Sequence, residues 1–262
     1  MLKKILCIAF PCLLCFFGCA KETEKEKVLT VQASSLPQAE LLKQIEPDLK
    51  AEGIKLKILV VDDYNIPNRA LAEGEINANF FQHKPFLDEQ IEQFHYDICP
   101  LSEVHIEPMG IYSLKGPLTD LSKGSLITIP NDPSNETRAL LLLEKAGLIL
   151  LKKESSSLTL KDISENHYEL KFKEIDAAFL TRTLDEVRAS VIPTNYALLI
   201  GLNPLKDSLF LEDSTSLYAN IIVIQKKDLL NPELLALKKH IESEKMHLYI
   251  DSTYNGALVP VH

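Results

Sequence analysis

The stretch from Val28 to Asp63 most restricts the fold, because it switches twice between the hydrophobic periods of strands and helices. The run VLTVQA (28–33) is β-branched and alternating, which is typical of a strand. Over residues 34–53, apolar side chains recur at helical spacing until Gly53 ends the pattern. The run IKLKILVVDD (54–63) again reads as a strand. A strand, a helix and a second strand of these lengths predict a βαβ unit with parallel strands.

The same alternation continues to the C-terminus. Helices are predicted over 67–76, 83–94, 136–147, 160–166 and 181–190, and from Pro232 onward. Strands are predicted over 77–82, 103–113 (a pair broken by Pro108), 125–130, 168–175, 189–202 (a strand running into a helix) and 217–228. The class is therefore α/β. Two domains are expected within the 262 residues, because the strand at 125–130 restarts the βα pattern after a crossover near 106–116.

The N-terminus has the features of a secretory leader. Lys3 and Lys4 precede an apolar run over 5–17 that is too short to span a membrane, and Cys19 follows Gly18. The Gly-Cys junction resembles a bacterial lipobox, in which cleavage precedes a cysteine that then carries lipid. We therefore expect 1–19 to form a lipoprotein signal ending at the lipidated Cys19, and an ordinary cleaved signal is the alternative.

Composition beyond the leader indicates a tethered, acidic protein. The charged stretch 20–27 is expected to be a solvated linker between the lipid and the folded body. Four of the five cysteines lie in the leader, so Cys99 has no partner for a disulfide in the mature chain. Removing Lys3 and Lys4 from the 28 basic residues leaves 26 against 37 acidic ones, a formal charge of −11. This balance argues against nucleic acid as a partner.

Motifs of enzymes and metal sites are missing from the sequence. It contains no H-E-x-x-H, G-x-S-x-G, P-loop or G-x-G-x-x-G pattern, and its seven histidines lack the spacing of metal ligands. Cys99, between Ile98 and Pro100, is expected to be a buried thiol. Glu107 and Asp176 are two acids that a catalytic pair would need, but the sequence gives no distance between them. We therefore expect neither catalysis nor a metal or cofactor.

The loop NDPSNETR, which leads into a Leu-rich helix, is a candidate binding site. We expect Asn135 or Ser134 to cap this helix, whose N-terminus then favours an anion. Arg138 is expected in the first turn, where its charge opposes the helix dipole, so a bound carboxylate is one interpretation. The other is a surface arginine paired with Glu136 or Asp132, and spacing alone does not separate the two.

Aromatic residues gather in a second region, around DDYNIPN and NANFFQHKPF. Tyr64, Phe81, His83 and Phe86 fall at predicted strand ends or in the loops that follow them, where they could line an apolar pocket. Taken singly, each is more often a core residue. Phe80 and Phe81 face opposite ways on a strand, so one of the two is expected to pack inward.

These residues lie in stretches that closely resemble the methionine-binding lipoproteins of methionine ABC importers. The resemblance rests on DDYNIPNRALAEGEINANFFQHKPFLDEQ, IPNDPSNETRALLLLEKAGLI and LYANIIV, which are spread over most of the mature chain. It implies an α/β, two-lobed periplasmic-binding-protein fold with a ligand between the lobes. The expected first lobe is 28–109, with 225–262 returning to it, and the expected second lobe is 110–224. The implied partners are L-methionine or a close derivative and an ABC transporter permease.

The resemblance also implies a set of ligand-binding residues. Arg138 would hold the carboxylate of the amino acid, and Asn195 and Asn220 would lie at its polar end. The thioether side chain would be surrounded by four residues, Tyr64, Phe81, His83 and Phe86. The protein would be lipid-anchored at the cell membrane and would face the periplasm or the exterior.

One position departs from the family pattern. Where relatives have V-I-N-x-N-Y or V-I-N-T-T-Y, this chain has VIPTNY, so Pro193 replaces an asparagine that contacts the ligand. Proline offers no side-chain amide, and Asn195 lies two residues further on. Losing that contact would cost roughly 1–3 kcal/mol, so we expect weaker methionine binding or a shifted ligand, such as another amino acid or a Met-containing dipeptide. A surface lipoprotein acting as an adhesin or antigen, or a secreted enzyme, remains an alternative.

Overall fold

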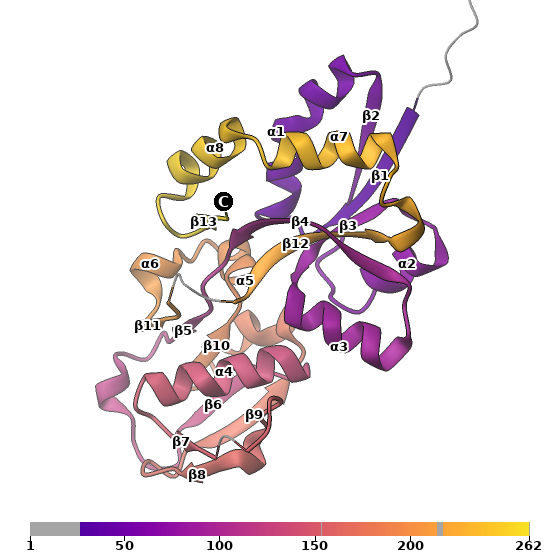
Figure 1. The fold of residues 1–262 in the computed structure, drawn as a ribbon. Helices are drawn as coiled ribbons and strands as arrows, with labels where there is room; N and C mark the ends of the chain where they lie inside the picture. The colour runs from indigo at the N-terminus through magenta and orange to yellow at the C-terminus, as the bar shows by residue number, and fades with distance from the viewer. Residues whose placement is uncertain (1–26, 153, 214–216, 262) are drawn as a thin grey trace, which may run out of the picture.

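The computed structural model describes residues 27–152, 154–213 and 217–261, and its chain is divided between two sheets (Figure 1). The expected leader, Cys19 and the linker up to residue 26 lie outside the described residues. The six-stranded sheet has the order β13-β4-β12-β3-β1-β2, and the five-stranded sheet has the order β11-β5-β10-β6-β9. Each sheet has helices packed against it, and we call the two units the first and second lobes.

The first lobe contains the predicted βαβ unit. Its strands are β1 (Lys27–Ala33), β2 (Ile54–Val60), β3 (Ala78–His83), β4 (Ile98–Ile106), β12 (Ala219–Gln225) and β13 (Val259–Pro260). β1 pairs in parallel with both β2 and β3, as the sequence predicted for β1 and β2, whereas β12 runs antiparallel to β3 and β4. Because β1, β2 and β3 are parallel, their carboxyl ends meet at one edge of the sheet.

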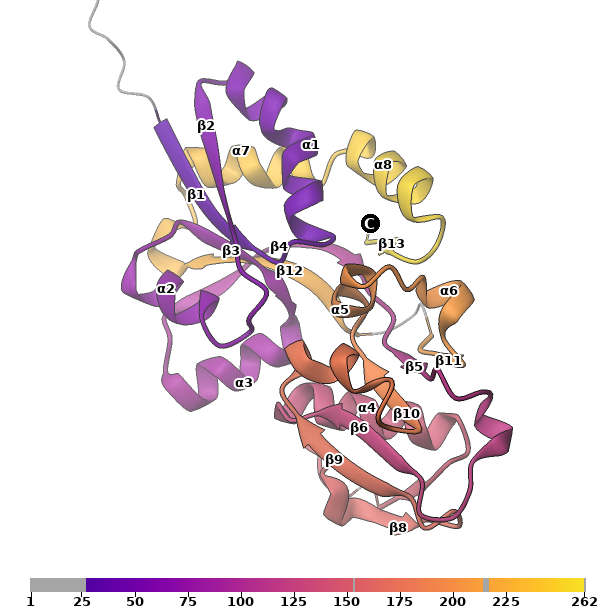
Figure 2. The same cartoon turned by 180° about the vertical axis from the view of Figure 1, so that it is seen from behind.

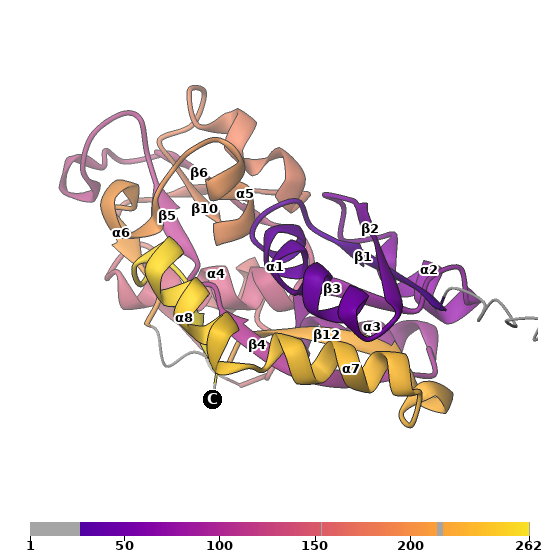
Figure 3. The same ribbon diagram turned by 90° about the horizontal axis from the view of Figure 1, so that it is seen from above.

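Helices cover both faces of the first sheet. On one face lie α1 (Gln38–Ala51), α7 (Pro232–Ile241) and α8 (Glu244–Tyr254), and on the other lie α2 (Pro67–Glu73) and α3 (Lys84–Phe94). The apolar side chains that predicted α1, Leu41, Leu42, Ile45 and Leu49, are all buried in the core. Each contributes roughly 1.5–3 kcal/mol of burial. Figure 3 shows α7 and α8 following one another along one side of this lobe.

The second lobe is built on the five-stranded sheet. Its strands are β5 (Gly110–Tyr112), β6 (Leu126–Pro130), β9 (Lys171–Ile175), β10 (Ala189–Ile192) and β11 (Phe210–Leu211), with β7 (Leu150–Leu151) and β8 (Ile163–Glu165) paired separately. Its helices are α4 (Pro133–Lys145), α5 (Thr194–Leu199) and α6 (Pro204–Asp207). Short 3₁₀ helices complete the chain at Leu118–Asp120, Leu160–Asp162, Ala177–Thr183 and Lys226–Asp228. Figure 2 shows this lobe from behind, below the first.

Two crossovers connect the lobes. The first, residues 107–109, joins β4 to β5, and the second, residues 212–218, joins β11 to β12. We had expected the second lobe to continue to residue 224, and that boundary is wrong, because β12 lies between β4 and β3 in the first sheet. The strand is buried over almost its whole length, which fits a central strand covered by helices on both faces.

Two predicted helices are also wrong. The stretch 181–190 contains the end of a 3₁₀ helix, a single turn closed by the Thr183 carbonyl and the start of β10. The stretch 160–166 contains one 3₁₀ turn followed by β8. The C-terminal helix is two helices, because Ser243 caps a new helix after α7 ends. Local apolar spacing does not distinguish a single turn from a longer helix.

Candidate functional site

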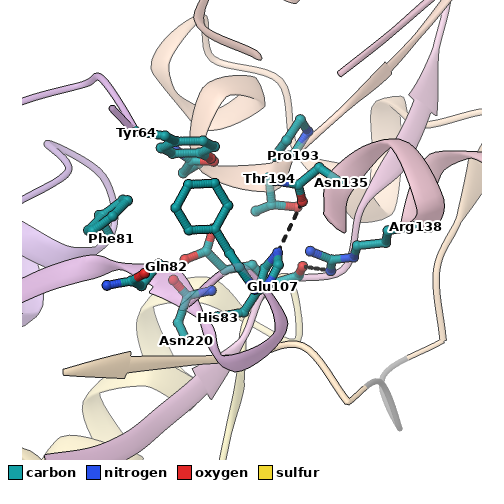
Figure 4. Close-up of a pocket in the computed structure, with 12 residues that line it drawn as sticks. Tyr64, Phe81, Gln82, His83, Glu107, Asn135, Arg138, Pro193, Thr194 and Asn220 are labelled. Atoms are coloured by element: carbon teal, nitrogen blue, oxygen red, sulfur yellow. Dashed lines mark hydrogen bonds between the residues drawn. The ribbon is translucent and has the colours of Figure 1, made fainter. Parts of the chain in front are cut away.

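A cavity lies between the lobes (Figure 4). The first lobe and the first crossover contribute Tyr64, Phe81, Gln82, His83, Phe86, Glu107 and Asn220, and the second lobe contributes Asn135, Arg138, Pro193, Thr194 and Asn195. The structure thus brings together all seven residues that the resemblance implied, although they span positions 64 to 220. Gln82, Glu107, Asn135 and Thr194 were not among the expected binding residues.

The position of the cavity follows from the two sheets. Tyr64 follows β2, His83 ends β3, Arg138 lies on the helix after β6, and Asn195 lies on the helix after β10. Because β1, β2 and β3 are parallel, and β9, β6 and β10 are parallel to one another, the cavity lies outside the carboxyl ends of strands from both lobes. This is where α/β folds generally bind ligands.

Three aromatic rings form one wall of the cavity. The ring centroids of Tyr64, Phe81 and Phe86 lie 5.8 Å apart in each pairing, with tilted or edge-on geometry. Phe80, next in sequence to Phe81, is fully buried in the first lobe core, so the two rings face opposite ways as predicted. Tyr196 packs against Tyr64 from the second lobe, at 5.2 Å between centroids. The wall therefore presents an apolar, polarisable surface.

His83 is held in one neutral form. Its Nδ1 accepts the backbone N–H of Phe86, which caps α3, and its Nε2 lies 3.0 Å from Asn135 Oδ1. Since Nδ1 is an acceptor, Nε2 carries the proton and donates a hydrogen bond to Asn135 Oδ1. Burial, together with the positive charge of Arg138, lowers the pKa of His83 to about 3. The imidazole therefore adds no positive charge to the cavity.

The loop into α4 is organised by Asp132. Its carboxylate accepts the backbone N–H of Asn135 at 3.0 Å and the side-chain amide of Asn135 at 2.9 and 3.0 Å. Asp132 is therefore the cap of α4, and the expectation that Asn135 or Ser134 caps it is wrong. The reason is that the helix begins at Pro133, a favoured first position, so the residue before it takes the cap.

Arg138 lies in the second turn of α4, not in the first as we expected, and it is buried, with 4% of its surface exposed. Its Nε lies 3.0 Å from both carboxylate oxygens of Glu212, and its Nη2 donates to Glu212 and, at 2.7 Å, to the backbone carbonyl of Glu107. The alternative of a surface arginine paired with Glu136 or Asp132 is wrong. Nη1 makes no hydrogen bond to a described residue, and it can donate to a ligand.

Two asparagines bring amide groups to the cavity. Asn195 Oδ1 accepts the hydroxyl of Tyr64 at 2.8 Å, while its Nδ2 is buried without a partner in the described part of the chain. Asn220 Oδ1 accepts from Gln38 Nε2 at 3.1 Å, which leaves its Nδ2 as a donor. Pro193, which lines the cavity beside Asn195, offers neither donor. The polar lining thus consists largely of N–H donors.

Glu107 is the acidic member of the lining, and its neighbours are buried polar groups. Its Oε1 lies 2.6 Å from Gln38 Nε2 and 2.7 Å from His105 Nε2, so both donate to the same oxygen. The sequence offered one signal for this residue, a single acid at the Pro108 break between two strands. Asp176, its hypothetical catalytic partner, instead caps a 3₁₀ helix and does not line the cavity.

Hydrogen bonds join the lobes around the cavity. Tyr64 bonds to Asn195 and His83 bonds to Asn135, and in each pair one residue belongs to each lobe. On the outside, Glu89 of α3 accepts the backbone N–H of Ser134, at the start of α4, at 3.0 Å. Burial, followed by the charge of Asp132, raises the pKa of Glu89 to about 7. The lobes are therefore closed on one another in this structure.

Other kinds of site are not evident in the described part of the chain. Within it, no three His, Cys, Asp or Glu side chains lie close enough together to hold a metal ion. Among the helices of residues 27–261 that the structure describes, none combines the length and apolarity needed to cross a membrane. Cys99 is partly exposed rather than buried as expected, and burial raises the pKa of its thiol.

The sequence is similar to those of known lipoproteins over most of its length. A family model described as NlpA lipoprotein matches residues 29–262. The methionine-binding lipoprotein MetQ of Bacillus subtilis (strain 168) is 39% identical over 243 residues, which are 90% of this chain and 89% of that protein. The D-methionine-binding lipoprotein MetQ of Escherichia coli (strain K12) is 36% identical over 257 residues, which are 94% of this chain and 93% of that protein.

Solved structures of methionine-binding proteins are similar to this structure in fold. A nutrient binding protein from Burkholderia cenocepacia, bound to methionine, superimposes with a TM-score of 0.86 at 40% identity and covers 89% of this chain and 100% of that chain. The methionine binding protein MetQ superimposes with a TM-score of 0.87 at 33% identity over 90% of this chain. The two-lobed periplasmic-binding-protein fold is thereby confirmed. By both its sequence and its structure, this chain belongs to the NlpA lipoprotein family.

Proposed function

We propose that the protein binds methionine, or a close derivative, between its lobes and delivers it to an ABC importer through the permease. The observation that carries the proposal is the division of the cavity into two ends. Arg138 lies on one side of the cavity, and the rings of Tyr64 and Phe81 lie on the other (Figure 4). An amino acid with an apolar side chain has the same division. The relatives of this protein in Bacillus subtilis and Escherichia coli are named as methionine-binding and D-methionine-binding lipoproteins.

Each end supplies interactions suited to its part of the ligand. At the polar end, Arg138 Nη1 and the free amide donors of Asn195 and Asn220 point to a bound carboxylate. At the other end, a thioether sulfur against the rings of Tyr64, Phe81 and Phe86 would gain roughly 0.3–1.5 kcal/mol per contact. His83, being neutral, adds shape and no charge that would repel or attract an ionic side chain.

Binding and release require the lobes to move. The cavity is lined from both lobes, so a ligand that touches both sides stabilises the closed form over an open one. The first crossover, at 107–109, is a segment about which the lobes would rotate. The cavity between the lobes supports a receptor more than an adhesin or an enzyme, since an adhesin needs no such cavity and the described lining contains a single carboxylate, Glu107, rather than a catalytic pair.

The location follows from the leader and the relatives. We propose that Cys19 carries lipid and holds the protein at the cell membrane, facing the periplasm or the exterior, because the matched relatives are named lipoproteins. Lys27, the first described residue, begins β1 at the end of the first lobe away from the second (Figure 1). A tether attached there leaves the mouth of the cavity free to meet the permease.

Titration calorimetry on protein that has been unfolded and refolded, to remove bound ligand, tests the proposal. We expect L-methionine to bind in the micromolar range or tighter, and L-lysine and L-glutamate to give no heat, because the aromatic end offers no partner for a charge. Asn220→Ala should weaken methionine binding roughly 5- to 100-fold by removing a donor, at about 1–3 kcal/mol. Binding of lysine or glutamate as tight as methionine would refute the proposal.

A further inference from the structure

Glu107 brings a buried carboxyl group to the cavity. Its residue is 5% exposed, and it is the carboxylate among the twelve lining residues that the structure describes. Both of its side-chain hydrogen bonds, from Gln38 and His105, fall on Oε1. Oε2 makes no hydrogen bond to a described residue, and it is not among the fully enclosed polar atoms that lack one. Oε2 is therefore available to a group inside the cavity.

Two basic side chains of the lining, Arg138 and His83, make their side-chain hydrogen bonds to groups other than the Glu107 carboxylate. Arg138 is paired with Glu212, and it meets Glu107 through the backbone carbonyl. His83 is neutral, with its pKa lowered to about 3 by burial and by Arg138. His105 donates from Nε2 to Glu107, and its Nδ1 is buried without a described partner. A buried carboxylate without a cation is costly, and a cationic ligand group removes that cost.

We propose that Glu107 binds the α-ammonium group of the ligand and makes the site selective for a free amino terminus. This inference rests on the proposed function and adds the class of ligand to it: methionine and its carboxyl-modified derivatives bind, and N-acylated methionine is rejected. Gln38 and His105 are positioning residues, since both hold Oε1 and thereby orient Oε2.

The geometry agrees with the dimensions of an α-amino acid. Arg138 Nη2 lies 2.7 Å from the backbone carbonyl of Glu107, so the guanidinium and the Glu107 residue are neighbours at one end of the cavity. In an α-amino acid the ammonium and the carboxylate are attached to the same carbon, and they need their two partners side by side. An acyl group on the nitrogen removes its charge and adds bulk beside Glu107 and Asn220, two lining residues that Gln38 holds by hydrogen bonds.

Arg138 and Glu107, the proposed partners of the ligand carboxylate and ammonium group, also differ in how far other residues already occupy them. Glu212 already occupies the Nε side of Arg138, which leaves Nη1 for a ligand carboxylate. Glu107 has no such competitor at Oε2. The ammonium contact should therefore contribute more to selectivity than the carboxylate contact. A site whose buried acceptor is left unpaired by a ligand without the N–H donor discriminates strongly against that ligand.

The test compares three ligands by calorimetry on the refolded protein: L-methionine, L-methioninamide and N-acetyl-L-methionine. We expect N-acetylation to weaken binding at least about 100-fold, by the loss of a buried charge-assisted contact, and amidation to weaken it by about tenfold. Glu107→Gln keeps an acceptor for Gln38 and His105 while removing the charge. It should weaken methionine about 30- to 100-fold and reduce the preference for methionine over its N-acetyl form at least tenfold.

A matched control is Glu103→Gln, the same substitution at an exposed position of β4, the strand that ends just before Glu107, and outside the cavity. It should leave all three affinities within about twofold, and thermal melting should show both variants folded. Equal binding of methionine and its N-acetyl form by the unmodified protein, or an unchanged preference in Glu107→Gln, would overturn the inference and leave the proposed function standing. No binding of methionine or methioninamide would overturn both.

Discussion

Arg138 and Glu212 form a buried ion pair that ties a helix of the second lobe to both crossovers. Arg138 Nε lies 3.0 Å from each carboxylate oxygen of Glu212, and Glu212 Oε2 also accepts the backbone N–H of Met109 at 3.0 Å. Met109 belongs to the first crossover and Glu212 to the second. The residue that we propose to hold the ligand carboxylate is therefore also bonded, through Glu212, to the first crossover at Met109, so the proposed ligand binding and closure share one group.

Glu212→Gln should lower the stability of the ligand-free protein. The change leaves Arg138 as a buried cation with a neutral partner, at a cost of roughly 1–3 kcal/mol. The same change makes the guanidinium more attractive to a ligand carboxylate, so the rise in Tm that methionine produces should be larger than in the unmodified protein. Urea denaturation measures the first effect and thermal melting with methionine the second.

Glu169→Gln is the matched control for Glu212→Gln, since Glu169 pairs with Lys123 on the surface. Exposed pairs of this kind contribute roughly 0–1 kcal/mol. If Glu212→Gln and Glu169→Gln have the same urea midpoint, the Arg138 pair does not stabilise the fold in the way we describe.

Tyr64→Phe should weaken methionine binding by shifting the lobes toward the open form. The substitution keeps the ring against Phe81 and Phe86 and removes the hydroxyl that donates to Asn195 across the cavity. One neutral hydrogen bond contributes about 0.5–1.5 kcal/mol, so the Kd should rise roughly 2- to 12-fold. Calorimetry measures the affinity, and small-angle scattering of the ligand-free protein should show a larger radius of gyration.

The control for Tyr64→Phe is Tyr168→Phe, which removes a hydroxyl from an exposed tyrosine of the second lobe that does not line the cavity. It should change neither quantity. An unchanged Kd and an unchanged radius in Tyr64→Phe would show that this bond does not hold the lobes together.

Much of the fold could be predicted because its strands and helices have distinct hydrophobic periods. The β1, α1 and β2 unit is one example, since its alternating and helical runs lie within 34 residues of each other. The place of β12 could not be predicted, because its antiparallel partners β3 and β4 lie more than 110 residues earlier. No local pattern records which sheet a returning strand joins.

The residues of the candidate site also fall into two groups, those that the sequence indicated and those that only the fold brings to the site. The seven residues taken from the family resemblance all line the cavity, but that information came from motifs rather than from physical patterns. Glu107, Gln38 and Glu212 were not singled out for binding, because their roles depend on contacts across 69 and 74 residues. An acid in a sequence shows neither its burial nor its partner, and only the fold supplies both.

Glu136→Gln should make the protein more stable at pH 8 and leave its stability at pH 5 nearly unchanged. Burial, followed by a hydrogen bond and repulsion from Glu174, raises the pKa of Glu136 to about 7. A folded-state pKa above the unfolded value means that this group supports the fold fully below about pH 4.3, and that this support is lost as the pH rises through about 7. Glutamine mimics the protonated form and can still accept the backbone N–H of Leu160.

Thermal melting of both proteins between pH 5 and pH 8 checks this prediction. The Tm of Glu136→Gln minus that of the unmodified protein should grow as the pH rises from 5 to 8. Glu73→Gln, an exposed change on α2, should show no such trend. A difference in Tm that is constant with pH would mean that the buried carboxyl does not titrate in this window.

Pro193→Asn should tighten methionine binding, and the structure indicates by how much. Pro193 lines the cavity and precedes α5 in an extended conformation, without a side-chain cap on that helix. Asparagine is favoured at such a position, so the change introduces no backbone strain. It supplies the amide that the family resemblance implies at this position, and one added hydrogen bond should lower the Kd roughly 2- to 12-fold.

The gain depends on whether Asn195 already replaces the missing amide. Asn195 lines the cavity and has a buried Nδ2 without a described partner, so we expect it to donate to the ligand where residue 193 cannot. Asn195→Ala should then weaken binding more in the unmodified protein than in Pro193→Asn, and the four proteins together form a double-mutant cycle that calorimetry can measure. Strictly additive effects would mean that the two positions act independently. If neither single change alters the Kd for methionine, this part of the lining does not contact the ligand, and the departure at Pro193 has no bearing on specificity.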